Sequence, residues 1–538
     1  MANTCVILVV AVLLTCLLVA GAGAADLLAG AARVDITPKM PVYLAGYGSN
    51  RLSDSVKTPL SARALVIKSG DKVVTIVGVD SMGVPGVLQQ EIRGMVKSVP
   101  QDTVMIAATH SHSAPDLYGM WGAPGTSGVN PEYLKAFKEG LLAAIEQAAA
   151  AVQPAKLKLG AIQTQGIIMN HRKVPILDPE LSAMQLVDAQ GKTIATLANL
   201  PCHAEIMHTK AVSADFPYYF YQKVEKDLGG VALFINGAEG GMITADIPGG
   251  VYSLEGKPEA DDWCRKIGEA VAEATEKALA EAKPIENPEL SYKITDISVP
   301  LENPAYQQAM KEGLMPSILV DGKINTKVAA LALGPAQIAT IPGELLPNEG
   351  LHLKRKMTGS PKFLFGLTFD ELGYIVSADD WGLDLYHYEA QEASIGPEIG
   401  PTVMNALLSL LSEVKPTGVP AAAAAPGAGG ALAGQVAAWF QALPGKLDKA
   451  KAEGVTSVYH FTLTGDGGGE WTISIADQKA TVENKAPEKA DLNVKISAQD
   501  WMDIVTGKLD AMAAFTAGRL EVDDVGRALE MAGLFLSD

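Results

Sequence analysis

Two histidines separated by a single residue, His110 and His112, are the side chains of this sequence best suited to chemistry. They follow residues 103–108, a short apolar run that is typical of a buried strand. In α/β proteins, ligands bind at the carboxyl ends of strands, and imidazole nitrogens are common ligands of catalytic metals, Zn²⁺ in particular. Taken alone, the pair is as consistent with one buried core histidine and one solvent-facing histidine as it is with a metal site.

Polar side chains also follow four other apolar runs, which lie within residues 193–368: His203, Asp215, Asn236, Glu344 and Tyr374. If these strands share one sheet edge, their ends converge on a single pocket. Two histidines and a carboxylate with one open position form a typical catalytic zinc shell. Each residue alone could instead be a loop, cap or core residue, so the predicted metal site depends on their joint placement.

The elements that must position these side chains can be predicted from hydrophobic patterning. Residues 73–79 and 103–108 flank a helical stripe that includes Leu88, which predicts a parallel strand–helix–strand unit. Asn130 and Pro131 begin the next helix as its cap and first-turn proline. Further strands are predicted at 193–200, 231–235, 328–333, 337–341 and 363–368, with a turn at Gly334-Pro335. Together they predict an α/β fold with a large mixed-sheet domain.

Composition divides the chain into two domains. Residues 413–432 are rich in alanine, proline and glycine, which is typical of an interdomain linker, so we expect a large domain over 30–412 and a small one over 433–538. In the small domain, a predicted helix around Trp439 precedes strand alternation at 459–463, 471–475 and 492–496. Residues 501–535 are predicted to be helical with breaks at Gly507 and Gly518. The pattern predicts a small α+β domain in which helices cover an antiparallel sheet.

The net charge of −18 argues against a nucleic-acid partner, because phosphate binding needs clustered Lys and Arg. It also disfavours electrostatic adhesion to anionic lipid, so any membrane-surface contact would use apolar side chains. Residues 1–25 carry no charge and end in a small-residue stretch, which predicts a signal peptide and an exported protein, secreted or periplasmic. An uncleaved N-terminal anchor stays open as an alternative. A disulfide between Cys202 and Cys264 is also left open.

Nine short motifs, in one order along the chain, carry a family resemblance: residues 32–38, 46–47, 62–64, 109–113, 202–203, 213–217, 236–238, 342–344 and 373–374. Together they resemble the neutral, non-lysosomal ceramidase family over residues 30–412. The resemblance implies that a zinc ion is bound by His110, His203, Glu344 and Tyr374. It further implies catalytic roles for His112 and Tyr374, with His112 assisting the attacking water or the oxyanion. Arg63, Asn236 and Asp215 would lie at the substrate.

The reaction that this resemblance implies is zinc-assisted hydrolysis of the N-acyl amide of a ceramide-like lipid to a fatty acid and an amine. Glu239 and Gly241 stand where the family often has glutamine and aspartate. Two alternatives stay open. One is a metallohydrolase that cleaves another N-acyl amide or an ester on the same scaffold. The other is a lipid-binding carrier without catalytic activity.

Motifs in residues 463–465, 469–472, 500–501, 506–509, 514–515 and 518–520 resemble the sterol carrier protein type two domain. The resemblance implies a lipid-binding module whose apolar tunnel holds a lipid or acyl chain. We expect the linker to keep this module at a raised effective concentration near the hydrolase domain. The small domain would then deliver the lipid substrate or remove the fatty product.

Overall fold

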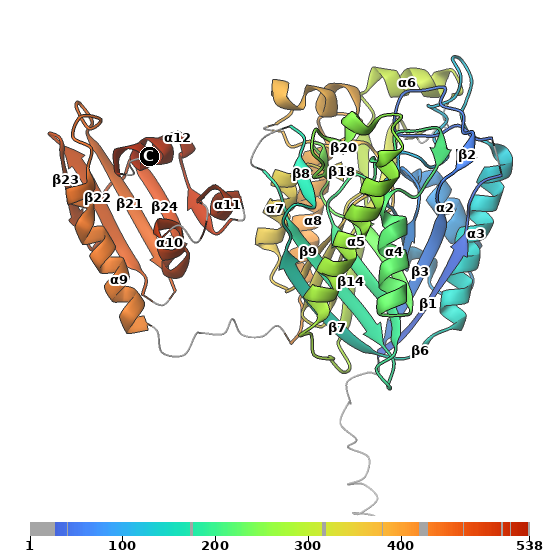
Figure 1. Ribbon diagram of the computed structural model, residues 1–538, viewed down its shortest axis with the longest axis horizontal. Helices are drawn as coiled ribbons and strands as arrows, with labels where there is room; N and C mark the ends of the chain where they lie inside the picture. The colour runs from blue at the N-terminus through green and yellow to red at the C-terminus, as the bar shows by residue number, and fades with distance from the viewer. Residues whose placement is uncertain are drawn as a thin grey trace, which may run out of the picture. The chain divides into compact units, whose positions relative to one another are not determined.

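The computed structural model describes residues 27–535, apart from residues 40, 173–175, 315–318, 379, 419–428, 466, 507, 508, 510 and 517. The predicted signal peptide, the central part of the predicted linker and the predicted helix break at Gly507 therefore lie outside the described residues. The described chain forms two compact units (Figure 1). The larger is built mainly from residues 27–418, and the smaller from residues 429–535 with the described parts of 170–178 and 347–356.

Three principal sheets form the larger unit. The first has the order β5-β4-β3-β1-β6, with β1 (Leu27–Asp35), β3 (Ser61–Ser69), β4 (Lys72–Val79), β5 (Val104–Ala108) and β6 (Gln153–Pro154). The second is β12-β10-β9-β7, with β7 (Lys156–Gln163), β9 (Glu180–Val187), β10 (Thr193–Leu200) and β12 (Val231–Asn236). The third is β14-β16-β17-β19, with β14 (Leu290–Pro300), β16 (Lys323–Leu333), β17 (Ala336–Thr340) and β19 (Lys362–Phe365), and β15 (Leu319–Val320) pairs with β16. Each sheet is mixed, because β4–β5, β10–β12 and β17–β19 are parallel pairs.

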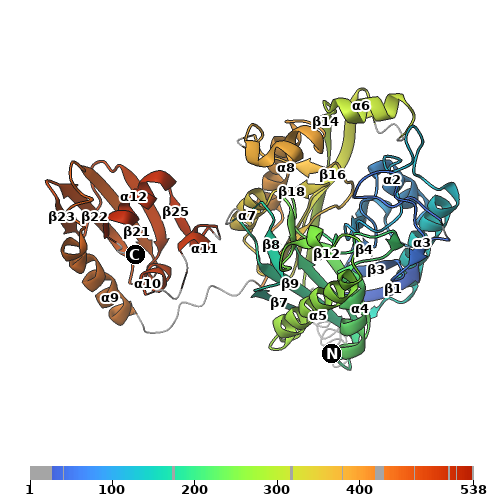
Figure 2. The same ribbon diagram turned by 45° about the horizontal axis from the view of Figure 1, so that its top comes forward.

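Helices cover the outer faces of these sheets, as Figure 2 shows from a second direction. α3 (Pro131–Ala150) lies against the first sheet, with α2 (Gly86–Met95) beside it in the same core cluster. α4 (Phe216–Asp227) and α5 (Glu259–Leu279) lie against the second sheet, and α8 (Ile399–Glu413) against the third. The inner faces of all three sheets share one core that includes Leu65, Leu197 and Phe363. This unit also contains α6 (Pro304–Lys311) and short helical turns at Gln101–Thr103, Val251–Leu254, Asp384–Tyr386 and Tyr388–Glu392, whereas α7 (Pro347–Lys356) is grouped with the smaller unit.

The predicted elements of the large domain are present. β4 and β5 are parallel and flank α2, and the Asn130 side chain caps α3 by accepting a hydrogen bond from the Tyr133 backbone N–H. Gly334-Pro335 is the turn that joins β16 to β17. The run at 363–368 leaves its sheet early, because Leu367 and Phe369 have positive φ angles of 52° and 74°. The expected single sheet edge is wrong, since the strands that precede the polar residues belong to three sheets.

The smaller unit has a five-stranded sheet of order β23-β22-β21-β24-β25. Its elements are α9 (Gly429–Ala442), a turn at Leu443–Lys446, β21 (Ser457–Thr464), β22 (Gly469–Ala476), β23 (Lys479–Glu483), β24 (Leu492–Ser497), α10 (Ala498–Val505), α11 (Ala511–Thr516), β25 (Leu520–Val522) and α12 (Val525–Phe535). The predicted antiparallel sheet is wrong, because the central pair β21–β24 is parallel. Residue alternation reveals the buried face of a strand but not its direction. The predicted helical segment after Trp501 also contains the strand β25.

No helix in the part of the chain that the structure describes combines the length and hydropathy needed to cross a bilayer.

Candidate metal centre

Backbone hydrogen bonds join the loops that carry the predicted site residues. The loop after β5 pairs with the loop after β10 through a parallel bridge between Ser111 and Ala204. Two short strands, β18 (Glu344–Leu345) and β20 (Tyr374–Ile375), pair in parallel and place Glu344 directly opposite Tyr374. These pairings bring residues from three sheets to one point. The site is therefore positioned by main chain and not by a single sheet edge.

His110 occupies a costly backbone conformation, with a φ angle of 66°. A non-glycine residue in this left-handed region loses about 1–3 kcal/mol relative to ordinary conformations. The surrounding main chain enforces it, because Thr109 N–H donates to Val79 O and Ser111 N–H donates to Ser81 O on either side. Such strain concentrates at functional sites. The turn aims the His110 ring away from β5 and toward the other histidines.

The rings of His110, His112 and His203 converge, with one nitrogen from each lying within 4.8 Å of the others. His110 Nε2 lies 3.1 Å from His112 Nε2. The ring centroid of His110 is 4.7 Å from that of His112 and 4.7 Å from that of His203. All three side chains are buried. Residues that are far apart in the sequence thus present imidazole nitrogens to a common point.

Backbone carbonyls orient two of these rings. His110 Nδ1 lies 2.7 Å from Met82 O, and His203 Nδ1 lies 2.9 Å from Ile243 O. A carbonyl oxygen only accepts hydrogen bonds, so each Nδ1 carries the hydrogen and each Nε2 can present a lone pair. This arrangement is usual for metal-binding histidines. The other ring nitrogens of His110 and His203 therefore face the convergence point as potential ligands.

Glu344 and Tyr374 complete the group of potential metal ligands. Glu344 Oε2 lies 3.0 Å from His203 Nε2 and 3.7 Å from His110 Nε2. The Tyr374 hydroxyl lies 3.5 Å from His203 Nε2. No described group donates a hydrogen bond to Glu344 Oε2 in good geometry, so its short contact with His203 reflects proximity and charge. A buried carboxylate oxygen without a donor is costly unless a cation satisfies it.

The spacing and chemistry of these side chains fit a divalent metal. In a tetrahedral zinc site with ligand bonds of about 2.0–2.2 Å, neighbouring ligand atoms lie about 3.3–3.5 Å apart. The observed separations of 3.0, 3.1, 3.5 and 3.7 Å scatter around that value. The set of imidazole, carboxylate and phenol donors suits Zn²⁺. Because His112 also reaches the point, the cluster supplies five candidate ligands, one more than a tetrahedral ion takes.

Burial and charge set the protonation of these groups. Burial lowers the pKa of His110 to about 4, and burial together with the neighbouring His110 lowers the pKa of His112 well below its usual value. Burial alone would also lower the pKa of His203, but the adjacent Glu344 carboxylate outweighs it and raises that pKa to about 9. His110 and His112 are therefore neutral at pH 7, as ligands or bases must be, whereas His203 would have to release its Nε2 proton to bind a metal.

The surroundings of His112 differ from those of its neighbours. Its Nδ1 lies 3.9 Å from Glu205 Oε2, and its ring meets Tyr47 edge-on at a centroid distance of 4.9 Å. The Arg51 guanidinium donates a hydrogen bond to the His112 backbone oxygen, and the Tyr47 hydroxyl donates to the backbone oxygen of Glu205. A carboxylate behind an imidazole is the arrangement that orients a general base.

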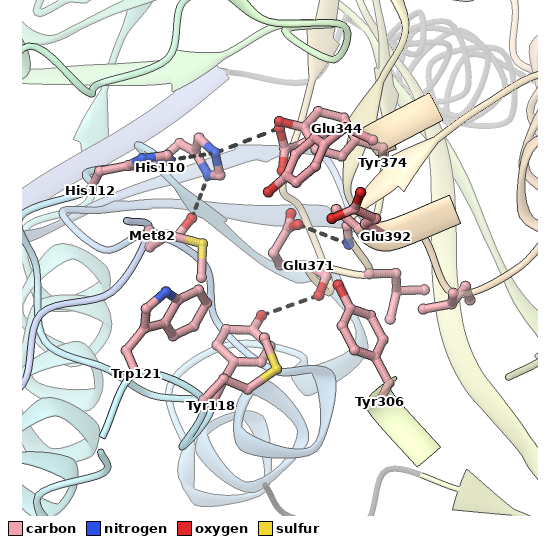
Figure 3. A pocket seen from close by; sticks show the side chains of 17 residues that line it. Met82, His110, His112, Tyr118, Trp121, Tyr306, Glu344, Glu371, Tyr374 and Glu392 are labelled. Atoms are coloured by element: carbon pink, nitrogen blue, oxygen red, sulfur yellow. Dashed lines mark hydrogen bonds and ion pairs between the residues drawn. The ribbon is translucent and has the colours of Figure 1, made fainter. Parts of the chain in front are cut away.

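A cavity of about 240 Å³ opens beside the convergence point (Figure 3). Dashed lines in Figure 3 join His110 to Met82, His112 and Glu344 at one end of the cavity. The rest of the lining includes the Met82 side chain and further aromatic and sulfur-containing side chains: Tyr118, Met120, Trp121, Tyr306 and Tyr388. The cavity therefore combines a polar end with a largely apolar body, as enzyme pockets do.

Arg63 does not line this cavity. It is buried, its Nη1 lies 2.5 Å from Glu225 Oε1, and its guanidinium stacks 3.6 Å from the centroid of the Tyr221 ring. These contacts hold α4 against β3. The substrate role implied by the family resemblance stays a prediction for this residue.

Asn236 and Asp215 also lie outside the cavity lining and hold the loops around it. The Asn236 side chain accepts from Cys202 N–H at 2.8 Å and donates to Cys202 O at 2.9 Å, which fixes the loop next to His203. Asp215 accepts from Phe216 N–H and from Met207 N–H, both at 2.7 Å. Their substrate roles likewise stay predictions.

Cys202 and Cys264 are both buried, and neither is in a disulfide within the described structure.

Sequence reasoning missed two carboxylates at the site, Glu205 and Glu371. Glu205 lies two residues after His203, so that this loop repeats the one-residue spacing of His110 and His112, and this spacing could have revealed it. Glu371 lies within the segment that precedes Tyr374, and its place in the cavity lining depends on the turn at Gly373, which has a φ angle of 74°. No spacing rule indicates that turn.

Comparison with known proteins agrees with this architecture. Residues 27–215 match the family model described as "Neutral/alkaline non-lysosomal ceramidase, N-terminal", and residues 438–535 match the "SCP-2 sterol transfer family". The crystal structure of neutral ceramidase from Pseudomonas aeruginosa superposes with a TM-score of 0.62 at 17% identity, covering 73% of this chain and 76% of that one. The larger unit thus has the fold of that enzyme, and both family resemblances inferred from the motifs are confirmed.

Sequence relatives match only parts of the chain. The neutral ceramidase of Pseudomonas aeruginosa is 28% identical over 155 residues, which span 25% of this chain and 23% of that protein. Hydroxysteroid dehydrogenase-like protein 2 of Xenopus tropicalis is 28% identical over 94 residues, which span 17% of this chain and 22% of that protein. The aligned segments thus cover less than a quarter of either relative.

Proposed function

Because its two parts match the neutral ceramidase and SCP-2 families, we propose that this protein is an exported, zinc-dependent amidohydrolase. It cleaves the N-acyl amide of ceramide-like lipids to a fatty acid and an amine. The observation that carries the proposal is the convergence of His110, His203 and Glu344 on one buried point beside a cavity. The confirmed resemblance supports the choice of an amide over other substrates.

In this proposal, His110, His203, Glu344 and Tyr374 hold the metal, which supplies Lewis-acid polarisation of the amide carbonyl when bound. His112 Nε2 faces the same point and takes a proton from the attacking water. Glu205, 3.9 Å behind His112 Nδ1, orients the ring and stabilises the imidazolium that forms. His112 then returns the proton to the leaving amine nitrogen.

The cavity size bears on how a lipid would bind. Its volume of about 240 Å³ lies below the range of about 300–1,000 Å³ that encloses a whole drug-sized ligand. It therefore encloses the amide and its neighbouring groups, while the remainder of a long acyl chain stays outside. Met82, Met120 and Trp121 supply the apolar wall for the first part of that chain.

The smaller unit is the proposed lipid-binding module. Its core contains an aromatic cluster in which Phe440 stacks on Trp471 at a centroid distance of 4.7 Å and lies 6.2 Å from Trp501. The match to the SCP-2 family supports binding of a lipid or acyl chain by this unit. We propose that it delivers the substrate or removes the fatty product.

The test measures zinc and ceramide hydrolysis together in the parent protein and in His110→Ala. We expect one zinc per chain in the parent, and in the variant loss of that zinc with a fall in activity of at least about 100-fold. His352→Ala, which removes a part-exposed imidazole on α7, is the matched control and should keep both.

Three outcomes would change the assignment. Full zinc and activity in His110→Ala would overturn the proposed centre. Zinc with cleavage of esters or other amides, but not of ceramide, would keep the centre and change the substrate. Lipid binding without zinc or hydrolysis would indicate the carrier alternative.

A further inference from the structure

The lining of the cavity is acidic. Among its described residues, Glu344, Glu371 and Glu392 contribute carboxylates, and none is Lys or Arg. Glu344 belongs to the metal centre, where a cation compensates its charge. Glu392 is exposed and lies at the rim. Glu371 is the carboxylate that remains inside, and the proposed mechanism gives it no part.

Glu371 is held rigidly on the cavity wall. It is only 7% exposed, and its Oε1 accepts a hydrogen bond from Gly373 N–H at 2.9 Å. The Tyr118 hydroxyl donates to the backbone oxygen of Glu371 at 3.3 Å. A Cβ atom at Gly83 would lie 2.5 Å from Glu371 Cγ, so Gly83 leaves room for this side chain. Figure 3 shows the Glu371 carboxylate between Glu344 and the Tyr118 ring.

One oxygen of this carboxylate has no partner. Glu371 Oε2 is buried, and no described group donates a hydrogen bond to it. A buried carboxylate oxygen left unpaired costs free energy that a donor from a ligand would recover. Burial and the charge of Glu344 raise the pKa of Glu371 well above its usual value, so a hydrogen-bond donor or a cation beside Glu371 is needed to hold it as a carboxylate.

We infer that Glu371 selects the amine half of the substrate: it accepts a hydrogen bond from a hydroxyl or ammonium group near the scissile amide and excludes a carboxylate. The inference rests on the proposed amidohydrolase function and narrows its substrate class. N-acyl amino alcohols and N-acyl diamines fit an acceptor-rich wall. N-acyl amino acids would place a second carboxylate beside Glu371, and like charges in a desolvated site repel strongly.

The experiment compares three dodecanoyl amides of similar size on the zinc-loaded, full-length protein: the ethanolamide, the aminoethyl amide and the glycine conjugate. We expect kcat/KM for the first two to exceed that for the glycine conjugate by about 100-fold, the size of a well-made or missing charged hydrogen bond. In Glu371→Gln, the Gly373 N–H keeps its acceptor, and the amide NH₂ can donate to a carboxylate. The glycine conjugate should gain about 10-fold, while the aminoethyl amide loses about 10-fold.

Glu281→Gln, which neutralises an exposed carboxylate beyond α5, is the matched control and should leave all three rates within twofold. Equal rates for the three amides in the parent, or a Glu371→Gln variant that changes them all alike, would overturn the inference. Cleavage of none of them would overturn the proposed function instead. In that case, calorimetric titration of the same compounds onto the parent and Glu371→Gln decides the charge preference, and failure of all three to bind would overturn it as well.

Discussion

At the scale of single residues, the geometry of His112 fits two roles, that of a metal ligand and that of a general base. Its Nε2 lies 3.1 Å from His110 Nε2, within the spacing of metal ligands, while its Nδ1 faces Glu205 at 3.9 Å. His110 and His203 instead use Nδ1 to donate to backbone carbonyls. The absence of such a carbonyl partner at His112, within the described structure, favours the role of a base that can gain and lose a proton.

Gly46 offers a test of that role without removing the imidazole. Gly46 has a φ angle of 90°, and a Cβ atom built on it would lie 2.4 Å from His112 Cγ. Gly46→Ala must therefore displace the His112 ring. If His112 is a base, we expect the variant to keep its zinc and lose kcat by about 10- to 100-fold, because a misplaced group costs that much. Zinc analysis and steady-state kinetics check this.

The matched control is Gly48→Ala, because a Cβ atom at Gly48 meets nothing within 4 Å. It should keep both zinc and kcat. Loss of zinc in Gly46→Ala would show instead that His112 is a ligand.

At the scale of elements, Asp215 connects α4 to the loop after His203. Its carboxylate caps α4 at Phe216 N–H and also accepts from Met207 N–H, while its backbone has a φ angle of 60°. The side chain is fully buried, and burial raises its pKa to about 6. The two backbone donors that hold the carboxylate thus compensate only part of the cost of its charge.

This raised pKa predicts a pH dependence of stability. In the unfolded chain the pKa of Asp215 is about 3.9, so between about pH 4 and pH 6 the folded state binds more protons than the unfolded state. The contribution of Asp215 to the free energy of unfolding therefore falls as pH rises through this window, by on the order of 3 kcal/mol. Asp215→Asn cannot ionise, but one of its two hydrogen bonds is lost at every pH.

We expect the stability of Asp215→Asn relative to the parent to improve between pH 4.5 and pH 6.5, measured from urea unfolding of the larger unit. Asp71→Asn, at an exposed position, is the control: its free energy of unfolding should differ from that of the parent by the same amount at both pH values. A constant difference between Asp215→Asn and the parent across this range would contradict the prediction.

Elements with a strong local signal could be predicted from sequence, and those set by long-range contacts could not. The runs at 73–79 and 193–200 and the cap at Asn130 depend on neighbouring residues, and they appear as predicted. The separation of the strands into three sheets depends on pairing between distant segments, which no periodicity records. For the same reason the parallel pair β21–β24 was predicted wrongly. The metal ligands could be proposed, because each follows an apolar run, but the place of Glu371 in the cavity lining depends on the turn at Gly373, which no sequence pattern indicated.

At the scale of the whole molecule, each compact unit has a core of its own. The larger unit buries residues such as Leu197 and Phe363, and the smaller buries Phe440, Phe461 and Trp471. Separate cores are expected of units that fold as domains. A covalent connection between them raises the effective concentration of one near the other without any fixed interface.

Removal of residues 430–538 tests the proposed contribution of the smaller unit. We expect the truncated protein to lose at least about 10-fold in turnover of ceramide presented in vesicles, because lipid transfer from the membrane slows. Turnover of a soluble short-chain amide should stay within about twofold. The comparison of the two substrates in one preparation corrects for the amount of folded enzyme, and an equal loss on both would contradict the proposal.

The orientation of the His110 and His203 rings depends on the peptide oxygens of Met82 and Ile243, which every amino acid possesses. Substitution of Met82, which lines the cavity, can therefore reshape the cavity wall without turning the His110 imidazole. If the lipid substrate changes during evolution, residues of the cavity wall can therefore be replaced while the two imidazole rings keep their positions. Engineering of new specificity is accordingly best begun at Met82 and at two other residues of the cavity lining, Met120 and Trp121.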